Sequence, residues 1–321
     1  MTTSGTKSIR TASGSYTIHH ASGAKGLPIG VFFSGGPGLS VAPERRHLEP
    51  LLRPHLDMIW FDQLGNAEAP AHSPESVTWR NLVDDAAHII RQEAGGPVHV
   101  IAHCAGVFAS HGLVASHREL VRSATLISPE GNAPLSFKSV LRGEIATGAL
   151  NPEALPAALR QHLDRVLGSS DVEWGKAEVD LILQLFAVAQ DWFGLYWRDQ
   201  TARARFEDLG RDAPIAVETF ARLATEQFEK REELGPIYSD IPVHVIHGEG
   251  DPCTIWEEEA PHVMKLAPAA KVTMISEGHH WPYFERPEPT IHAMVAFIQE
   301  HSTSAKAWTP AGTKGLRKAL A

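Results

Sequence analysis

The stretch Val98-His99-Val100-Ile101-Ala102-His103-Cys104-Ala105-Gly106 decides the fold of this 321-residue chain. Its first six residues form a short run that is rich in β-branched side chains, which is typical of a strand buried on both faces. A helical pattern follows over Val107–Leu120, so a sharp turn is expected at Cys104. Ala102 and Gly106 lie two positions before and after Cys104, and such small residues let a strand and a helix pass close together.

The turn gives Cys104 the properties of a nucleophile. Its thiol is expected to point away from the sheet at a helix N-terminus, where partial positive charge favours the thiolate. The backbone N–H of Ala105 is free to donate to an oxyanion. The pattern is a nucleophile elbow with Cys in place of the usual Ser, and Ala in place of the usual first Gly. The alternative is a buried structural cysteine, since cysteine is among the most often buried residues.

Strand and helix patterns alternate on both sides of this turn. Strands are expected at Ser15–His20, Ile29–Ser34, Met58–Asp62, Val98–His103, Ala124–Ser128, Val243–His247 and Val272–Ser276. Helices are expected at Glu44–Leu52, Trp79–Glu93, Val107–Leu120, Glu257–Leu266 and Thr290–His301. This alternation predicts an α/β fold with a mostly parallel sheet covered on both faces by helices.

One long segment, from about Gly131 to Ser239, has no convincing strand pattern. It contains amphipathic helical patterns near Pro152–Leu167, Lys176–Asp199 and Ile215–Glu233. We therefore expect a core formed by residues 1–130 and 240–301, a helical lid over residues 131–239, and a tail at 302–321. Such a lid lies over the carboxyl edge of the sheet, where α/β enzymes bind their ligands.

A glycine-rich loop follows an early strand. Gly35-Gly36-Pro37-Gly38 comes directly after Ile29–Ser34. Backbone N–H groups in such a loop can face a ligand, so Gly35 or Gly36 is a candidate for the second oxyanion donor. A simple tight turn is the alternative interpretation.

An acid and a base follow two later strands. Asp251 ends the turn Gly248-Glu249-Gly250-Asp251, where a carboxylate can orient an imidazole. The alternative for Asp251 is a side chain that only stabilises its turn. His279 and His280 follow the last strand, and either can take the thiol proton. The order nucleophile, acid, base is that of hydrolase folds.

With these motifs the chain resembles the α/β-hydrolase superfamily, and within it the proline iminopeptidase-like branch. The matching segments are Gly35–Gly38, Trp60–Gly65, the turn at Cys104, Gly248–Asp251 and His280–Pro287. The resemblance implies His280 as the base, because a Glu follows five residues later and a Pro two residues after that. His279 stays as the alternative.

The chain also departs from that branch. Ser34 replaces the His that usually opens the glycine loop, Leu64 replaces an Arg, and His279 replaces a Gly. No lid motif matches the acidic residues with which iminopeptidases hold a free amino group, and this argues against peptidase activity. A cysteine nucleophile is similar to that of dienelactone hydrolases and some biosynthetic thioesterases and cyclases.

These features predict an enzyme that acts on an activated ester, lactone or thioester through an acyl-thioenzyme on Cys104. An acyltransferase, cyclase or condensing enzyme of the same fold is the first alternative, because the acyl group can pass to an acceptor other than water. An aminopeptidase of the iminopeptidase type is the second, and a non-catalytic ligand-binding protein is the third. An engineered Ser-to-Cys replacement at Cys104 also stays open.

Several other residues are candidates for the site. Aromatic residues of the lid and of the histidine loop are candidate substrate contacts, with core packing as the alternative: Trp192, Tyr196, Trp197 and Trp281. Glu130, after the strand Ala124–Ser128, is a candidate reserve acid. Cys253, close after Asp251, is expected to be a buried loop thiol with a possible redox role.

Composition limits the partners. The net charge is −9 and the basic residues are scattered, so neither nucleic acid nor an anionic membrane is expected. No metal-ligand cluster or dinucleotide-binding motif appears, so no cofactor is expected. Two cysteines and no apolar leader indicate a cytoplasmic protein without a disulfide framework. The expected partner is a small acyl substrate, free or carried on CoA or a carrier protein.

Overall fold

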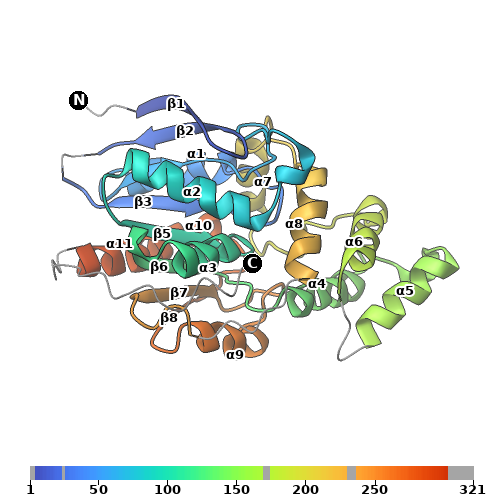
Figure 1. Ribbon diagram of the computed structural model, residues 1–321. Coiled ribbons are helices and arrows are strands. Elements are labelled where there is room, and N and C mark those ends of the chain that lie inside the picture. The colour runs from blue at the N-terminus through green and yellow to red at the C-terminus, as the bar shows by residue number, and fades with distance from the viewer. Residues whose placement is uncertain (1–3, 24–25, 169–173, 230–235, 303–321) are drawn as a thin grey trace.

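A computed structural model describes residues 4–23, 26–168, 174–229 and 236–302, and shows one sheet covered by helices (Figure 1). The strands of the sheet are β1 Ser4–Arg10, β2 Ser15–Ala21, β3 Ile29–Phe33, β4 Asp57–Trp60, β5 Val98–His103, β6 Val121–Ile127, β7 Val243–Gly248 and β8 Lys271–Ile275. Their order across the sheet is β1-β2-β4-β3-β5-β6-β7-β8.

Most of the sheet is parallel. Strands β1 and β2 pair antiparallel, as do β2 and β4. Every pairing from β4 to β8 is parallel. The carboxyl ends of the parallel strands therefore meet at one edge, and the loops that follow them gather their side chains there.

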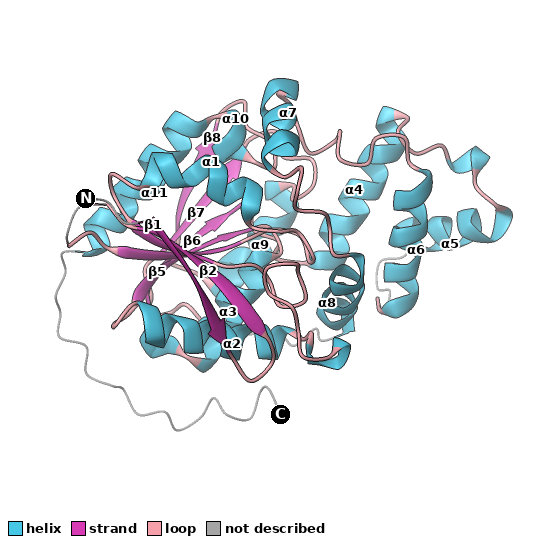
Figure 2. Cartoon of the chain, turned by 90° about the horizontal axis from the view of Figure 1, so that it is seen from above, coloured by secondary structure: helices cyan, strands magenta, loops and turns pink. Residues whose placement is uncertain are grey.

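Helices cover both faces of the sheet, as the view along it shows (Figure 2). The helices are α1 Ala42–Leu52, α2 Trp79–Glu93, α3 Gly106–Ser116, α4 Ala133–Thr147, α5 Ala157–Gly168, α6 Lys176–Val188, α7 Gln200–Leu209, α8 Val217–Glu229, α9 Trp256–Leu266, α10 Pro282–Glu285 and α11 Pro287–Ser302. Helices α2, α3 and α9 share one hydrophobic core with the sheet, and α1, α7, α10 and α11 share the other.

The segment between β6 and β7 contains helices joined by loops, and no strand occurs in the part of it that the structure describes. Helices α4, α5, α6 and α8 pack around a third hydrophobic core of their own, which includes Leu141, Leu163 and Phe228. In Figures 1 and 2 these helices extend beyond one end of the sheet. They follow the carboxyl end of β6, so they lie over the edge where the loops of the parallel strands meet.

The fold class that the sequence predicts is confirmed, and the strands predicted between Ser15 and Ser276 are present. The hairpin partner β1 was not predicted, because Ser4–Arg10 is polar and has only one side chain, Ile9, in the core. The predicted helix Lys176–Asp199 is wrong in its second half. Helix α6 ends at Val188, and the side chain of Asp199 caps the next helix by accepting hydrogen bonds from two backbone N–H groups.

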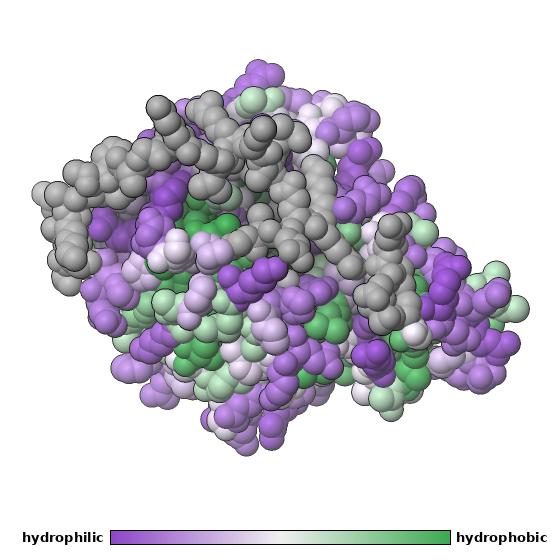
Figure 3. Space-filling model, turned by 60° about the horizontal axis from the view of Figure 1, so that its bottom comes forward, coloured by the Kyte–Doolittle hydropathy of each residue, from purple (hydrophilic) through white to green (hydrophobic). Residues whose placement is uncertain are grey.

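The remaining differences concern boundaries and surface. The predicted helix Val107–Leu120 ends at Ser116 and continues as a 3₁₀ turn at Arg118–Leu120. The predicted tail at 302–321 lies outside the described residues except for Ser302. No helix in the described ranges is long and apolar enough to cross a membrane. On the face in Figure 3, hydrophobic residues form separate patches among hydrophilic ones.

The contact between the first residue of α3 and the end of β3 leads to a stability prediction. A Cβ atom on Gly106 would lie 2.5 Å from the carbonyl oxygens of both Phe33 and Ser34. Gly106→Ala should therefore lower the free energy of unfolding by about 1–3 kcal/mol, because backbone atoms of the central sheet must move. Urea unfolding measures this change.

The matched control is Gly96→Ala. A Cβ atom there meets nothing within 4 Å, so its free energy of unfolding should change by no more than about 0.5 kcal/mol. Equal stability of the two variants would contradict the close approach of α3 to the sheet.

Candidate active site

Cys104 occupies the turn between β5 and α3. All six residues of β5 are buried, and the N–H of Cys104 continues the sheet by donating to the carbonyl of Ile127 at 3.0 Å. The backbone then reverses at Cys104 with φ of +50°, a conformation that is uncommon for any residue other than glycine. Gly35 packs against the turn, since a Cβ atom there would lie 3.1 Å from the Cβ of Cys104.

His280 and Asp251 form a buried pair at the same edge of the sheet. Asp251 follows β7 and His280 follows β8. Nδ1 of His280 donates to Oδ2 of Asp251 at 2.9 Å, and both side chains are almost completely buried. This bond leaves Nε2 of the ring free of Asp251, and His280 lines the same cavity as Cys104, whose charge contributes to the raised pKa of the imidazole.

Asp251 and His280 each stabilise the charged form of the other. Burial alone lowers the pKa of His280, but the charges of Asp251 and Cys104 outweigh it and hold that pKa well above its usual value. Burial alone raises the pKa of Asp251, but His280 and His247 hold it well below its usual range. Asp251 therefore stays ionised and stabilises the imidazolium that proton transfer creates.

The turn after β7 holds the carboxylate of Asp251 in place. Oδ1 accepts the backbone N–H of Cys253 at 2.8 Å and that of Thr254 at 3.2 Å, and Oδ2 accepts the hydroxyl of Thr254 at 2.7 Å. The ring of His247 lies 3.9 Å from Oδ2 and contacts the carbonyls of Gly248 and Thr254. With His280, the carboxylate has four donors, so its orientation is fixed.

Hydrogen bonds from the segment after β4 hold the glycine loop in position. The side chain of Gln63 accepts the N–H of Gly38 at 2.9 Å and donates to the carbonyl of Ser34 at 3.1 Å. Oδ1 of Asp62 accepts the hydroxyl of Ser40 at 2.9 Å and the N–H of Val41 at 2.7 Å. These bonds explain why the motif around Asp62 and Gln63 accompanies the glycine loop.

Two of the three expected oxyanion residues border the cavity at the thiol. Gly36 and Ala105 line it together with Cys104, whereas Gly35 lies behind them against the ring of His103. No described residue accepts a hydrogen bond from the N–H of Gly36 or Ala105. Both groups are therefore available to a ligand, and Gly36 is the better placed of the two glycines.

The cavity has a volume of about 80 Å³ and mostly apolar walls. Six aromatic residues of the lid line it together with Ser136, Val140 and Ile215; the aromatic residues are Phe137, Phe186, Trp192, Phe193, Tyr196 and Phe220. Of the four expected substrate contacts, Trp192, Tyr196 and Trp281 line the cavity. Trp197 does not, because its ring stacks on the far side of Trp281, with centroids 4.8 Å apart.

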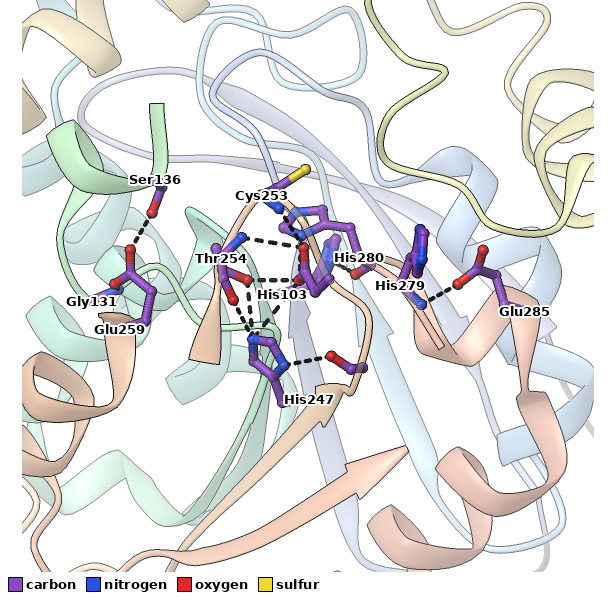
Figure 4. Close-up of polar contacts among 12 residues, drawn as sticks. His103, Gly131, Ser136, His247, Cys253, Thr254, Glu259, His279, His280 and Glu285 are labelled. Carbon is purple, nitrogen blue, oxygen red and sulfur yellow. Dashed lines mark hydrogen bonds and ion pairs between the residues drawn. The ribbon is translucent and has the colours of Figure 1, made fainter. Parts of the chain in front are cut away.

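The lid segment beside Trp197 is bonded to the histidine loop. The carbonyl of Tyr196 accepts the N–H of His280 at 3.4 Å. Oε1 of Glu285 accepts the N–H groups of Arg198 and Asp199 at 2.6 and 3.0 Å, and its Oε2 accepts the N–H of His279 at 2.5 Å (Figure 4). His280 lines the cavity with Cys104, whereas His279 is not among the residues that line it.

Glu130 lies in the cavity wall but does not orient the histidine. Its Oε2 accepts the side chain of Gln227 from α8 at 2.8 Å, and no described residue donates to its other oxygen. Burial raises its pKa to about 7, although Gln227 and His280 act in the opposite direction. The carboxyl is therefore a polar group of the cavity rather than a substitute for Asp251.

Some of the cavity was not foreseen from the sequence. Cys253 lines it, and burial together with the charge of Asp251 raises the pKa of its thiol. The ligand atoms of Asp251, Cys253 and His280 lie within 4.8 Å of one another, a spacing compatible with a metal ion. For Cys253 the signal was its place two residues after Asp251. For Phe137 and Phe186 no local signal existed, because only the packing of α4 and α6 places them here.

Comparisons with known proteins agree with this architecture. A family model for the alpha/beta hydrolase fold matches residues 31–287. A proline iminopeptidase-related protein from Thermus thermophilus has 18% identity and a TM-score of 0.65, covering 92% of this chain and 98% of that one. A carboxylesterase structure from Nitrososphaera gargenis has 16% identity and a TM-score of 0.61, covering 92% and 99%.

A third similar structure is an epoxide hydrolase from Vigna radiata, with 15% identity, a TM-score of 0.61, and coverage of 92% and 98%. A search of curated proteins finds no match. At these identities the solved structures show the fold alone. The family model spans most of the chain, and so the chain belongs to the α/β hydrolase fold family.

Proposed function

We propose that the protein is a hydrolase that uses Cys104 as its nucleophile and acts on an activated ester, lactone or thioester through an acyl-thioenzyme. The observation that carries the proposal is the position of Cys104. It lies at a strained turn with positive φ, borders the cavity, and faces a histidine that a buried carboxylate orients. Membership of the hydrolase-fold family supports the same reaction class.

Each residue of the site has a defined role in the proposed reaction. The sulfur of Cys104 attacks the substrate carbonyl carbon, and Nε2 of His280 takes the thiol proton. The N–H groups of Gly36 and Ala105 stabilise the oxyanion, each contributing about 3–4 kcal/mol. His280 then gives its proton to the leaving group, and water releases the acyl group with His280 as the base.

The choice of an activated acyl group follows from the sulfur. Exchange between a thiolate and a thioester has little net energy cost, whereas an amide would leave a poor amine leaving group. The apolar and aromatic walls of the cavity favour an apolar or aromatic acyl group. No Lys or Arg lines the cavity in the part of the chain that is described, so nothing there would pair with an anionic acyl chain.

Intact-protein mass spectrometry with an acyl thioester tests the nucleophile. The wild type should gain the mass of the acyl group at Cys104. Cys104→Ala should show no adduct and lose about 10⁴-fold or more in kcat, as removal of a nucleophile does elsewhere. Full turnover by Cys104→Ala would contradict the proposal.

Cys253→Ser is the matched control, because it removes the other cysteine of the chain. The adduct should persist in this variant and should map to Cys104. The lifetime of the adduct separates hydrolysis from transfer. Prompt release of free acid indicates hydrolysis, and an adduct that persists until an amine or alcohol is added indicates an acyltransferase.

Glu130 leads to a pH prediction. Its pKa is raised to about 7 from the ordinary 4.5, so the carboxyl is neutral below pH 7 and ionised above it. An apolar acyl chain removes water from the carboxyl and disfavours its charge. KM for a neutral aryl ester should therefore rise as the pH passes above about 7, with kcat much less affected.

Glu130→Gln removes the titrating group and should flatten this rise in KM. Steady-state kinetics between pH 6 and about 9 measure both variants, a range that brackets the shifted pKa. A KM that falls with rising pH in the wild type would contradict the prediction.

A further inference from the structure

We propose that Glu130 selects substrates whose acyl group carries a hydroxyl group, by forming a hydrogen bond with that hydroxyl inside the cavity at Cys104. The inference names a substrate class for the site described above, so its kinetic test rests on the proposed function. Its binding test does not, because binding needs only the cavity and the carboxyl.

Glu130 offers a hydrogen-bonding atom in a wall that is otherwise mostly apolar. Among the described residues that line the cavity, Glu130 alone carries a carboxyl. The side chain follows β6 and is buried. Its Oε2 accepts the side-chain amide of Gln227 at 2.8 Å, whereas no described residue donates to its Oε1. Buried polar atoms are nearly always paired, so Oε1 is the atom that a polar group of a ligand would use.

The lid holds this carboxyl in place. Gln227 belongs to α8 and is itself buried, and its Nε2 is the donor to Glu130. Oε1 of Gln227 has no hydrogen-bond partner among the described residues. The pair therefore has more acceptors than donors, and a ligand that brings a donor would correct the imbalance.

A second carboxyl near Glu130 is already paired. The charges of Glu259 and Glu130 interact, but Glu259 is not among the residues that line the cavity. Its oxygens accept the N–H groups of Gly131 and Asn132 at 2.8 and 2.9 Å and the hydroxyl of Ser136 at 2.6 Å (Figure 4). Recognition of a polar group in the cavity therefore falls to Glu130.

The charges at the site favour a neutral group over an ammonium. The imidazole of His280 becomes positively charged when it takes the thiol proton, and its charge acts on Glu130. An ammonium beside Glu130 would face this second cation between apolar walls, where the repulsion is weakly screened. A hydroxyl group brings a donor without a charge.

The protonation of Glu130 favours a hydroxyl over a group that only accepts. Burial raises the pKa of Glu130 to about 7, so both the neutral and the ionised carboxyl occur near neutral pH. A carbonyl or ether oxygen can pair only with the neutral form. A hydroxyl group can donate to either form, and its bond to the ionised form is the stronger one.

Isothermal titration calorimetry at pH near 8, where a carboxyl of this pKa is mostly ionised, tests binding to the full chain. The probes are the ortho, meta and para hydroxyphenylacetamides, each compared with the methylphenylacetamide of the same pattern, which has a methyl group of similar size. At least one hydroxyl probe should bind about 10–100-fold more tightly than its methyl counterpart, as expected for one hydrogen bond to a charged group. Absence of this preference in all three pairs overturns the proposal.

Variants assign the preference to the carboxyl. Glu130→Leu should reduce the ratio of the two affinities to about twofold or less, because no acceptor remains. Glu130→Gln keeps an acceptor of the same size without the charge, and its ratio should lie between those of the wild type and Glu130→Leu. An unchanged ratio in either variant overturns the proposal.

Phe137→Leu is the matched control. Phe137 lines the same cavity and has no polar side-chain atom, so its replacement should change both affinities of a probe pair alike. The ratio should therefore remain that of the wild type. Loss of the ratio in this control overturns the proposal, because the shape of the wall would then make the selection.

Turnover is measured separately with thioesters of the same acids. The ratio of kcat/KM between hydroxyl and methyl substrates should follow the ratio of affinities, mainly through KM. Full turnover by Cys104→Ala together with a preserved hydroxyl preference in binding would overturn the proposed function alone. An acyl adduct at Cys104 without any hydroxyl preference would overturn only the role of Glu130.

Discussion

The close approach of α3 to the central sheet is the constraint on which the site depends. Gly106 begins the helix against the carbonyls of Phe33 and Ser34, which leaves one residue, Cys104, to reverse the chain with positive φ. The packing of β5 and α3 supplies the energy that holds this strained conformation. As a result the thiol projects from the rigid centre of the sheet into the cavity, and the helix N-terminus lies directly behind it.

Parallel pairing explains why distant motifs meet at this thiol. The strands β3, β5, β7 and β8 all end at the same edge, and each is followed by a loop that contributes to the site. Hydrogen bonds hold these loops in place, within one loop between Asp251 and Thr254 and between two loops from Gln63 to Ser34. The geometry is therefore set before a substrate binds, as electrostatic stabilisation of an oxyanion requires.

Local sequence was enough to predict the sheet apart from β1, the turn at Cys104, and the acid and base candidates, because each depends on a few adjacent residues. It could not identify Gln227 as the partner of Glu130, since the two are nearly a hundred residues apart and meet only through the packing of α8. It could not separate Trp192, which lines the cavity, from Trp197, which stacks behind Trp281. Both lie in one aromatic run, and only tertiary structure decides which way each ring faces.

The contacts of Glu285 with the backbone of Arg198 and Asp199 have a consequence for access to the cavity. They join one margin of the lid to the segment that carries His280, and the carbonyl of Tyr196 accepts a hydrogen bond from the backbone of His280 itself. Displacing this margin would pull the imidazole away from the sulfur. Exchange of reactants that preserves the catalytic geometry therefore has to leave this margin of the lid in place.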